Sequence, residues 1–519
     1  SRRKPSRALP WVFSAALALP LAGCMVGPAY QTPQPLTQPA PESYKEDPAR
    51  FPNDTAWKVA EPQDALLHGK WWEIFGDTEL NGLEDQLNIN NQNIKIYFEN
   101  FLASRALIGQ TQSQLWPTVS VNATYTKSHS PFGGSVGAGG STIGAVSRGS
   151  SGNNGNSIST FASLPFDVSW EPDLWGKIRY AINQAQYDTQ LSAADLENER
   201  LTEQSALAVY FFELRGQDAL QKLYNDTIAA DKKMLAYTKT QFETGIGTQI
   251  SVVEAQNTLD TAIAAAAGIG VARAQDEHAI AVLIGKSPSQ FSMPVRPLLA
   301  EPPEIPIGVP SQLLQRRPDV ASAERAMAAA NAQIGIGYAA YYPTLTLSAD
   351  AGFESDALKT LLNWPSRFWS VGPAVSYTIF DAGLRKAAIE QYVAEYNADL
   401  YTYRQTVLTA FQQVEDDLAA TRILSQQAVL TTQAVASSQK SYNLEFSRFQ
   451  TGIDPFIDVV TSENALLVNQ QSEVAIKVQA VTSAVQLVAA LGGGWDLAQL
   501  PTTQQVSKWP TTQETAIQH

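Results

Sequence analysis

Apolar residues recur at helical spacing over much of this chain. One seam alternates intervals of four and three residues: Ile389, Val393, Tyr396, Leu400, Tyr403, Val407, Ala410 and Val414. This heptad spacing predicts a coiled-coil helix. The stretch 176–243 contains no proline, and as one helix rising about 1.5 Å per residue it would be roughly 100 Å long. Such lengths favour a tube across an aqueous space over a compact core; a coiled-coil tether between two envelope layers is the alternative.

Four shorter segments alternate between apolar and polar residues. Two outgoing strands are predicted at 118–126 and 344–353, with returning strands around 164–170 and 369–377. A period of two with one polar face is typical of transmembrane barrel strands, for which about ten residues suffice; the edge of a soluble sandwich is the alternative. Bacterial membrane barrels begin at about eight strands, so several chains would have to share one, and three chains would supply twelve. The tryptophans that suit an interfacial aromatic belt, or else ordinary packing, are Trp170, Trp364 and Trp369.

The chain contains an internal repeat. Pro117 lies in Leu-Trp-Pro-Thr-Val-Ser-Val and Pro343 in Tyr-Tyr-Pro-Thr-Leu-Thr-Leu, 226 residues later. Phe-Glu-Thr-Gly-Ile around Gly245 matches Phe-Gln-Thr-Gly-Ile around Gly452, 207 residues later. The difference of 19 residues falls between Pro117 and the returning strand, an interval that holds the run 131–158, dominated by Gly, Ser and Asn. The halves are therefore interpreted as two copies of one unit, the first with a flexible insertion.

The repeated Thr-Gly motifs separate pairs of helical runs. They are Thr244-Gly245 and Thr451-Gly452. Because glycine adopts the left-handed conformation that ends a helix, tight helix-to-helix turns are predicted at 244–249 and 451–456, far from the strands. In the second copy Asp454 and Pro455 follow, which predicts an N-cap residue and a proline at the first helical position.

Composition excludes several classes of function. The net charge of -14 repels nucleic-acid phosphates, so no nucleic-acid partner is expected. The four histidines are scattered and unpaired, and the sequence has no nucleophile elbow, phosphate-binding loop or dinucleotide fingerprint. No enzymatic activity, no metal and no cofactor beyond a covalent lipid is therefore expected. The single cysteine excludes a disulfide within one chain.

The first residues resemble a bacterial lipoprotein signal. Residues 1–23 combine four basic residues with an apolar run from Ala8 to Leu19 that is too short to span a bilayer stably. The ending Leu-Ala-Gly-Cys is similar to a lipobox, whose cysteine, here Cys24, receives diacylglycerol and becomes the new N-terminus. An ordinary signal peptide followed by a chance cysteine is the alternative. Met25 is compatible with delivery to the outer membrane.

These signals predict an α+β membrane protein with long coiled-coil helices and four transmembrane strands per chain. The expected segments are a lipoprotein signal at 1–23, a lipid-anchored extended arm at 24–70, a first repeat at 71–285 with its hairpin at about 118–170, an inter-repeat link at 286–310, a second repeat at 311–494 with its hairpin at about 344–378, and a C-terminal tail at 495–519.

Several short motifs follow one another along the chain in an order that indicates a known protein family. They are Cys24 with Val26-Gly27-Pro28-Ala29-Tyr30, Trp71-Trp72, Arg316-Arg317-Pro318-Asp319, Ser370-Val371-Gly372-Pro373, Phe380-Asp381-Ala382-Gly383 and Leu491-Gly492-Gly493-Gly494-Trp495. Together they resemble the TolC family of outer-membrane factors, and most of all its NodT-like lipoprotein branch, which serves RND-type multidrug efflux systems. The resemblance covers nearly the whole mature chain.

The resemblance implies a homotrimer that closes a twelve-stranded β-barrel in the outer membrane and a helical barrel in the periplasm. An equatorial belt of arm, link and tail would surround the helices. The implied partners are a periplasmic membrane-fusion adaptor, an inner-membrane RND transporter and the outer-membrane lipid. The implied function is passive export of drugs or other small toxic compounds, gated at the periplasmic tip.

The resemblance also implies site residues in the second turn and the helix after it. The gate is expected to contain Asp454, Asp458, Thr461 and Glu463, where Thr461 replaces a second aspartate of many relatives. Three copies of such a carboxylate ring would favour cations. A plain N-cap is the alternative for Asp454, and a solvated helix face for Asp458. The adaptor is expected at both turns, through Thr244, Gly245, Thr451 and Gly452; pure backbone geometry is the alternative for the glycines.

Two other functions fit parts of this pattern. The outer-membrane duct of a type I secretion system would use similar strands and helices, although the lipid anchor and the Leu-Gly-Gly-Gly-Trp ending argue against it. A non-conducting envelope tether would need only the helices.

Overall fold

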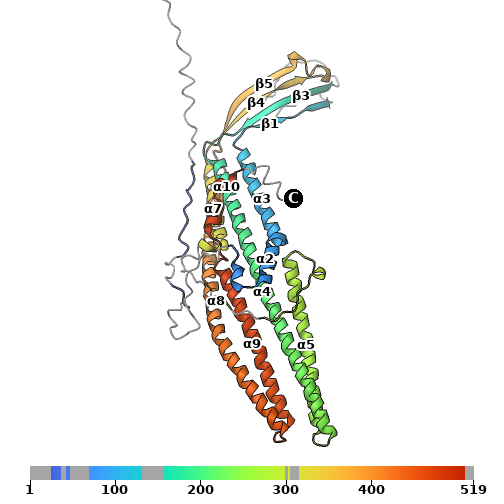
Figure 1. Ribbon diagram of the computed structural model, residues 1–519. Coiled ribbons are helices and arrows are strands. Elements are labelled where there is room, and N and C mark those ends of the chain that lie inside the picture. Colours follow the sequence, from blue (N-terminus) through green and yellow to red (C-terminus); the bar gives the residue numbers. More distant parts are fainter. Residues whose placement is uncertain are drawn as a thin grey trace, which may run out of the picture.

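The computed structural model of the chain describes residues 25–36, 43–46, 69–130, 157–298, 302–303, 305 and 315–508. Cys24, the predicted signal and most of the run 131–158 lie outside these residues. Figure 1 shows an elongated molecule with a curved sheet at one end. Two long helices, α4 and α8, lead away from the sheet, and at the opposite end each turns back into a shorter helix, α5 or α9.

Each half of the chain contains the same three helices. They are α3 (Gln92–Ser113) and α7 (Pro318–Ala339) with 22 residues each, α4 (Lys177–Glu243) and α8 (Leu384–Gln450) with 67 each, and α5 (Gln249–Leu283) and α9 (Phe456–Ala490) with 35 each. The lengths agree residue for residue, and their starts are offset by the 226 and 207 residues found in the sequence.

The short helices stack end to end beside the long ones. Near the sheet α4 packs against α3 and α7, whereas toward the tip it packs against α5 and α9. Where α5 ends and α3 begins, Asn91 Nδ2 donates to the Leu283 carbonyl at 2.9 Å. Where α9 ends and α7 begins, Arg317 Nη1 donates to the Ala490 carbonyl at 2.9 Å. Each pair of short helices therefore forms one column, interrupted at mid-shaft.

The sheet is antiparallel and has four lanes. The strands are β1 (Thr118–Val121), β2 (Thr124–Ser130), β3 (Ser157–Trp170), β4 (Thr344–Ser355) and β5 (Arg367–Ser376). β1 and β2 both pair with β3 in one continuous register, so together they occupy the lane of the first predicted strand, which is interrupted at 122–123. β3 pairs with β4, and β4 with β5. Among the described residues, each outer lane pairs with a strand on one side only.

The two faces of the sheet differ in polarity. One row across the lanes contains Val119, Val168, Ala349 and Val371, and the next contains Ser120, Asp167, Asp350 and Ser370. Residues of the apolar face are widely exposed, including Trp369 at 78% and Val371 at 73%. The alternation predicted from the sequence is therefore present, and nothing in the described part of the chain covers its apolar side.

A belt around the middle of the shaft contains the main core. Its elements include the short helices η3 (Trp71–Phe75), α2 (Thr78–Asn90), η4 (Pro288–Gln290), η7 (Leu497–Gln499) and α10 (Thr503–Ser507). Trp71 is fully buried and its Nε1 donates to Gln204 Oε1 at 3.1 Å. Phe75 packs against Phe212 of α4 with ring centroids 5.2 Å apart. The burial of these aromatic rings fixes the belt to the shaft.

A buried ionic network attaches the inter-repeat link to the first half. Asp218 of α4 is fully buried and accepts from Arg215 Nη1 at 3.1 Å and from Arg273 Nε of α5 at 2.7 Å. Its other bond comes from the backbone N–H of Arg296 in the link, at 2.8 Å. Arg215 Nη1 also donates to the Pro294 carbonyl at 2.7 Å. Every partner of Asp218 is therefore a donor that would otherwise be left partly unsatisfied.

Two helices differ in environment from what their sequences alone suggest. The predicted heptad seam lies within α8, but only its lower part, from Tyr403 to Val414, is buried, while Val393 is 39% exposed. The reason is that α8 lies at one side of the molecule (Figure 1). α9 is the one described helix long and apolar enough to cross a membrane. Its extensive packing on α8, and its contact with α4, account for that composition.

Candidate functional site at the hairpin tips

Both tips are closed by the same backbone motif. Gly245 has φ +77° and Gly452 has φ +75°, so each adopts the left-handed conformation that was predicted. The N–H of Ile246 donates to the Gln241 carbonyl and that of Ile453 to the Arg448 carbonyl, both at 2.9 Å. These bonds close the last turns of α4 and α8 in the pattern of a Schellman motif.

The tip threonines serve the same helix ends. Thr244 Oγ1 donates to the Thr240 carbonyl at 2.8 Å, and Thr451 Oγ1 donates to the Arg448 carbonyl at 2.9 Å. A Cβ added to Gly245 or Gly452 would meet no other described atom within 4 Å. Within one chain, backbone conformation alone therefore explains the glycines, and the close approach of an adaptor stays a prediction.

Asp454 does not cap α9, contrary to the sequence-based expectation. The helix begins at Phe456 with Pro455 as its N-cap residue and without a side-chain cap. Asp454 instead forms an ion pair with Arg448 in the last turn of α8, with Arg448 Nη2 donating to Oδ1 at 2.9 Å. This bond lowers the pKa of Asp454 below its usual value. Pro455 is extended and is itself the N-cap residue, so α9 starts one residue later than predicted. The carboxylate of Asp454 therefore bonds to the end of α8 and not to the start of α9.

The predicted gate residues lie on two different faces of α9. Asp458 and Thr461 are exposed and one helical turn apart. Thr461 Oγ1 donates to the Ile457 carbonyl at 2.8 Å. Glu463 is 9% exposed and faces α4 instead. The structure thus brings Asp458 and Thr461 together but separates Glu463 from them.

Glu463 forms a buried carboxyl pair with Asp231 of α4, which is 2% exposed. Burial and the neighbouring Asp231 raise the pKa of Glu463 to about 8, and burial also raises the pKa of Asp231. The pair lies beside an apolar cluster that joins all four tip helices, including Met234, Leu259, Phe456 and Val459. Because two adjacent buried carboxylates repel, the pair holds a proton near neutral pH.

The Glu463→Gln variant should change how stability depends on pH. The pKa of Glu463 is raised above its unfolded value, so folded wild-type protein holds this proton more tightly than unfolded protein. Its stabilisation is complete below about pH 4.5 and is lost as pH rises through about 8. Between pH 6 and 9 the thermal midpoint of the wild type should fall more than that of the variant. Equal slopes in thermal scans, with Glu243→Gln at the exposed end of α4 as the control, would contradict the shared proton.

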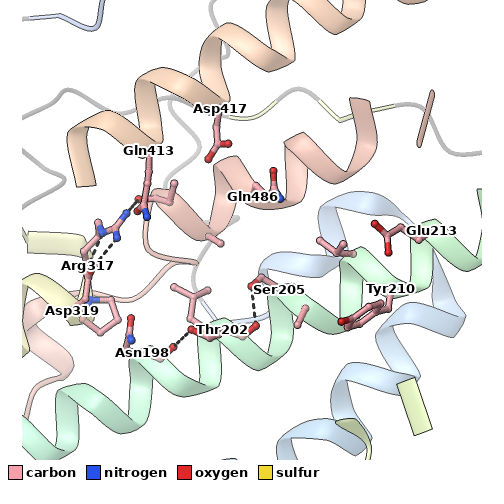
Figure 2. A pocket seen from close by; sticks show the side chains of 16 residues that line it. Asn198, Thr202, Ser205, Tyr210, Glu213, Arg317, Asp319, Gln413, Asp417 and Gln486 are labelled. Atoms are coloured by element: carbon pink, nitrogen blue, oxygen red, sulfur yellow. Dashed lines mark hydrogen bonds and ion pairs between the residues drawn. The ribbon is translucent and has the colours of Figure 1, made fainter. Parts of the chain in front are cut away.

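A hollow of about 770 Å³, lined by both polar and apolar side chains, lies at mid-shaft between α4, α8 and the junction of α7 with α9. Figure 2 shows Asn198, Thr202 and Ser205 along α4, with Asp417 on α8 opposite. Burial raises the pKa of Asp417 to about 6.

The N-terminal arm packs on another side of α4, where Tyr30 contacts Tyr187. The described residues contain no group of metal-binding side chains.

The arm reaches the junction between sheet and shaft. A Cβ on Gly176, the residue before α4, would come within 2.9 Å of Met25 Cγ, so Met25 packs directly on that residue. Further along the arm, Asn331 of α7 donates to the Pro28 carbonyl at 3.3 Å and Tyr30 donates to Glu324. The residue after Cys24 therefore lies beside the end of the sheet, while Cys24 itself is outside the described residues.

Sequence reasoning missed the Asp231–Glu463 pair and the Arg448–Asp454 bond. The sequence did hold a signal for the Arg448–Asp454 bond. Arg448 and Asp454 lie on either side of the predicted turn between two helices, which brings opposite charges close together. No comparable signal exists for the first. The two acids are 232 residues apart, and only the packing of α4 on α9 makes them neighbours.

Comparison with known proteins gives consistent results over most of the chain. The profile of the outer membrane efflux protein family matches residues 84–286 and 309–493. The probable efflux pump outer membrane protein TtgC of Pseudomonas putida is 29% identical over 93% of this chain and 95% of its own length. OprJ of Pseudomonas aeruginosa is 25% identical over 93% and 96%.

Solved structures of outer-membrane channels have the same fold. OprN, 25% identical, superposes with a TM-score of 0.78 over 91% of this chain and all of that one. CmeC of Campylobacter jejuni, 21% identical, superposes with a TM-score of 0.79 over 93% of this chain and 98% of that one.

An amphipathic sheet on a shaft of paired helices is the fold that this chain shares with these outer-membrane channels. The chain belongs to the outer membrane efflux protein family. Its location is accordingly the outer membrane and its function is that of an efflux channel, a transport role and not an enzymatic one. The name of TtgC describes such a protein as the outer-membrane component of an efflux pump.

Proposed function

We propose that three copies of this chain close into one tube that spans the outer membrane and extends into the periplasm. The observation that carries this proposal is the sheet: four lanes with an apolar outer face and one unpaired edge at each side. Exposed strand edges pair readily with other strands, and four strands are too few to close a membrane barrel. Pairing β5 of one copy with β1 and β2 of the next satisfies both edges.

The edges of the shaft support the same assembly. α3 and α5 on one side expose Ile96, Leu107 and Val271 at 56%, 52% and 61%. α8 on the other side exposes Leu430 and Leu444 at 63% and 57%. Apolar residues at this density along a water-exposed helix indicate a contact with another chain. The mass of the complex in detergent would test the trimer, and a monomeric mass would contradict it.

A lipid on Cys24 would anchor each copy at the inner surface of the membrane. This proposal is supported by the lipobox-like sequence and by the contact of Met25 with Gly176, next to the end of the sheet. A diacylglyceryl group inserted there would enter the membrane at the level where the strands do. The intact mass of the purified chain would show the lipid, and an unmodified N-terminal cysteine would refute the anchor.

The cargo that we propose is drugs and other small toxic compounds, delivered by an RND-type transporter through its adaptor. Among the similar proteins, one is named a toluene efflux pump outer membrane protein and another an antibiotic efflux pump outer membrane protein. Deleting the gene should raise susceptibility to a panel of solvents and antibiotics, and the purified protein should carry current in planar bilayers. Current with unchanged susceptibility but lost protein secretion would favour a type I secretion duct. Absence of current would favour a tether.

Asp458 is our candidate for the carboxylate ring at the gate. It is exposed in the first turn of α9, and its exposed neighbour Thr461 adds no charge. We expect Asp458→Ala to reduce the preference of the channel for cations, because a ring of three carboxylates attracts them at close range. Reversal potentials across a salt gradient measure this preference. Glu463→Ala serves as the comparison, since Glu463 faces α4. An unchanged reversal potential for Asp458→Ala would exclude it from the gate.

The adaptor is proposed to dock on the tips, whose exposed apolar residues include Ile246 at 80% and Ile453 at 66%. Gly452→Ala tests this contact. Gly76 is its matched control, since both glycines have positive φ and open space around a Cβ. Each substitution should cost about 1–2 kcal/mol of stability. Only Gly452→Ala should also lower antibiotic resistance at equal protein levels, and equal resistance of the two variants would remove Gly452 from the interface.

A further inference from the structure

The charged residues of the strands are sorted by face. Side chains alternate between faces along a strand, and the strand pairings assign each charge. Asp167 pairs with Asp350, and Glu354 pairs with Ser163, so all three carboxylates share the polar face. Arg367 pairs with Phe353, and Lys127 with Thr160, so both cations lie on the apolar face. His129, two residues beyond Lys127, lies on that face too.

Each of the two outer lanes carries one cation on its apolar face, beyond an aromatic residue. On β2, Tyr125 is the outermost aromatic residue of the apolar face, and Lys127 lies two residues farther from the helices. On β5, Trp369 has that place, and Arg367 lies two residues farther. In both lanes, therefore, a cation follows an aromatic residue on the apolar face, toward the end of the sheet that is far from the helices. If the apolar face contacts lipid, these cations lie at the level of the headgroups.

The loop between β4 and β5 supports Arg367. The Arg367 guanidinium lies 3.6 Å from the centre of the Trp364 ring. Stacking on an aromatic face leaves the N–H donors at the edge of a guanidinium free for planar, bidentate bonds to a phosphate. Trp364 is itself 71% exposed, as are Leu358 at 64% and Leu362 at 70% in the same loop. Neither Arg367 nor Lys127 has a carboxylate partner within the described residues.

We propose that this outer rim binds the phosphate groups of lipid A, the membrane anchor of lipopolysaccharide. The inference rests on the membrane-spanning trimer proposed above. The helices extend into the periplasm, so the far end of the sheet lies at the outer leaflet, whose lipid in Gram-negative cells is lipopolysaccharide. Arg367, whose guanidinium stacks on Trp364 of the loop, donates to its phosphates.

The site is completed by the neighbouring copy. In the trimer β5 of one chain lies next to β2 of the next, so Arg367 of one copy and Lys127 of the other face lipid on the same side of one seam. Lipid A carries two phosphates, which can be shared between these cations. The carboxylates Asp167, Asp350 and Glu354 point to the other face and so do not repel the lipid. Three seams would give three equivalent sites.

Binding to lipid A measured on the purified full-length complex tests the proposal. The probes are diphosphoryl lipid A, monophosphoryl lipid A and phosphatidylglycerol in mixed micelles, with bound lipid counted by native mass spectrometry. Arg367→Gln and Lys127→Gln should each weaken binding of diphosphoryl lipid A about fivefold, the effect expected for one cation near an anionic lipid surface. Lys440→Gln, on exposed α8 in the shaft, removes the same charge and should have no effect.

The expected order of affinity is diphosphoryl lipid A, then monophosphoryl lipid A, then phosphatidylglycerol. Equal affinity for the two forms of lipid A, or unchanged binding in Arg367→Gln, would overturn the proposal. Phosphatidylglycerol bound as tightly as diphosphoryl lipid A would replace it by a general preference for anionic lipid. Channel current in Arg367→Gln should equal that of the wild type, so loss of lipid binding is distinguishable from failure of the exit duct.

Discussion

Replacing Asp218 by alanine is expected to lower the free energy of unfolding by about 3–5 kcal/mol, the range found when one partner of a buried ion pair is removed. Asp218 is fully buried and accepts bonds from Arg215, Arg273 and the backbone of Arg296. Without it Arg215, whose side chain is 2% exposed, stays buried and keeps hydrogen bonds to Glu79 and the Pro294 carbonyl among the described residues. The inter-repeat link should loosen from α4 at the same time.

Chemical denaturation of the detergent-solubilised protein, followed by circular dichroism, measures this loss. Lys222→Ala is the matched control, because Lys222 lies about one turn further along α4 and forms an exposed ion pair with Asp226. Exposed pairs of this kind contribute about 0.5 kcal/mol or less. Limited proteolysis should cut the link near Arg296 faster in Asp218→Ala than in the control. A midpoint for Asp218→Ala equal to that of Lys222→Ala would show that the network does not hold the belt.

Gly492→Ala should be similarly severe for a different reason. Gly492 ends α9 with φ +97°, and a Cβ there would overlap the carbonyl oxygen of Arg316. The left-handed conformation costs a residue with a side chain about 1–2 kcal/mol, and the collision with backbone adds a comparable amount, about 3 kcal/mol in total. The overlap lies where α9 meets α7, so the Arg317 bond to the Ala490 carbonyl should break as well.

Gly69→Ala separates the two causes. Gly69 has φ +94°, nearly the same conformation, but an added Cβ would meet no other described atom within 4 Å. It should therefore show the conformational cost without the collision. Thermal unfolding of both variants gives the comparison, with Gly492→Ala melting well below Gly69→Ala. Coincident melting curves would mean that the α9–α7 junction can shift to accept a side chain.

Much of this architecture could be predicted from local patterns. The proline-free stretch from 176 to 243 is the helix α4, and the strands follow the predicted alternation, because burial of one face imposes a fixed period on the sequence. The glycines at the tips were correctly predicted to be left-handed. Their neighbour Asp454 was not correctly predicted, because a carboxylate beside a helix start can bind either the helix or a nearby cation, and Arg448 is the stronger partner.

The candidate site could be predicted only in part. Asp458 and Glu463 are five residues apart, and the sequence does not say which face of α9 meets α4. That choice depends on how two long helices wind around each other, so the burial of Glu463 against Asp231 follows from tertiary packing alone. The separation of acidic and basic side chains onto opposite faces of the sheet could be predicted only in part. Alternation along each strand is local, but the alignment of Arg367 with Phe353 needs the register between strands.

The equal helix lengths of the two halves restrict which insertions the helices can accept. With 67 and 35 residues in each copy, both hairpins reach the same depth and present their turns at one level. A single added turn in α4 alone would displace one tip by about 5 Å relative to the other. Insertions in the helices therefore have to occur in both copies or be removed by selection. The 19 residues by which the halves differ lie instead between β1 and β3, where added length leaves both tips in place.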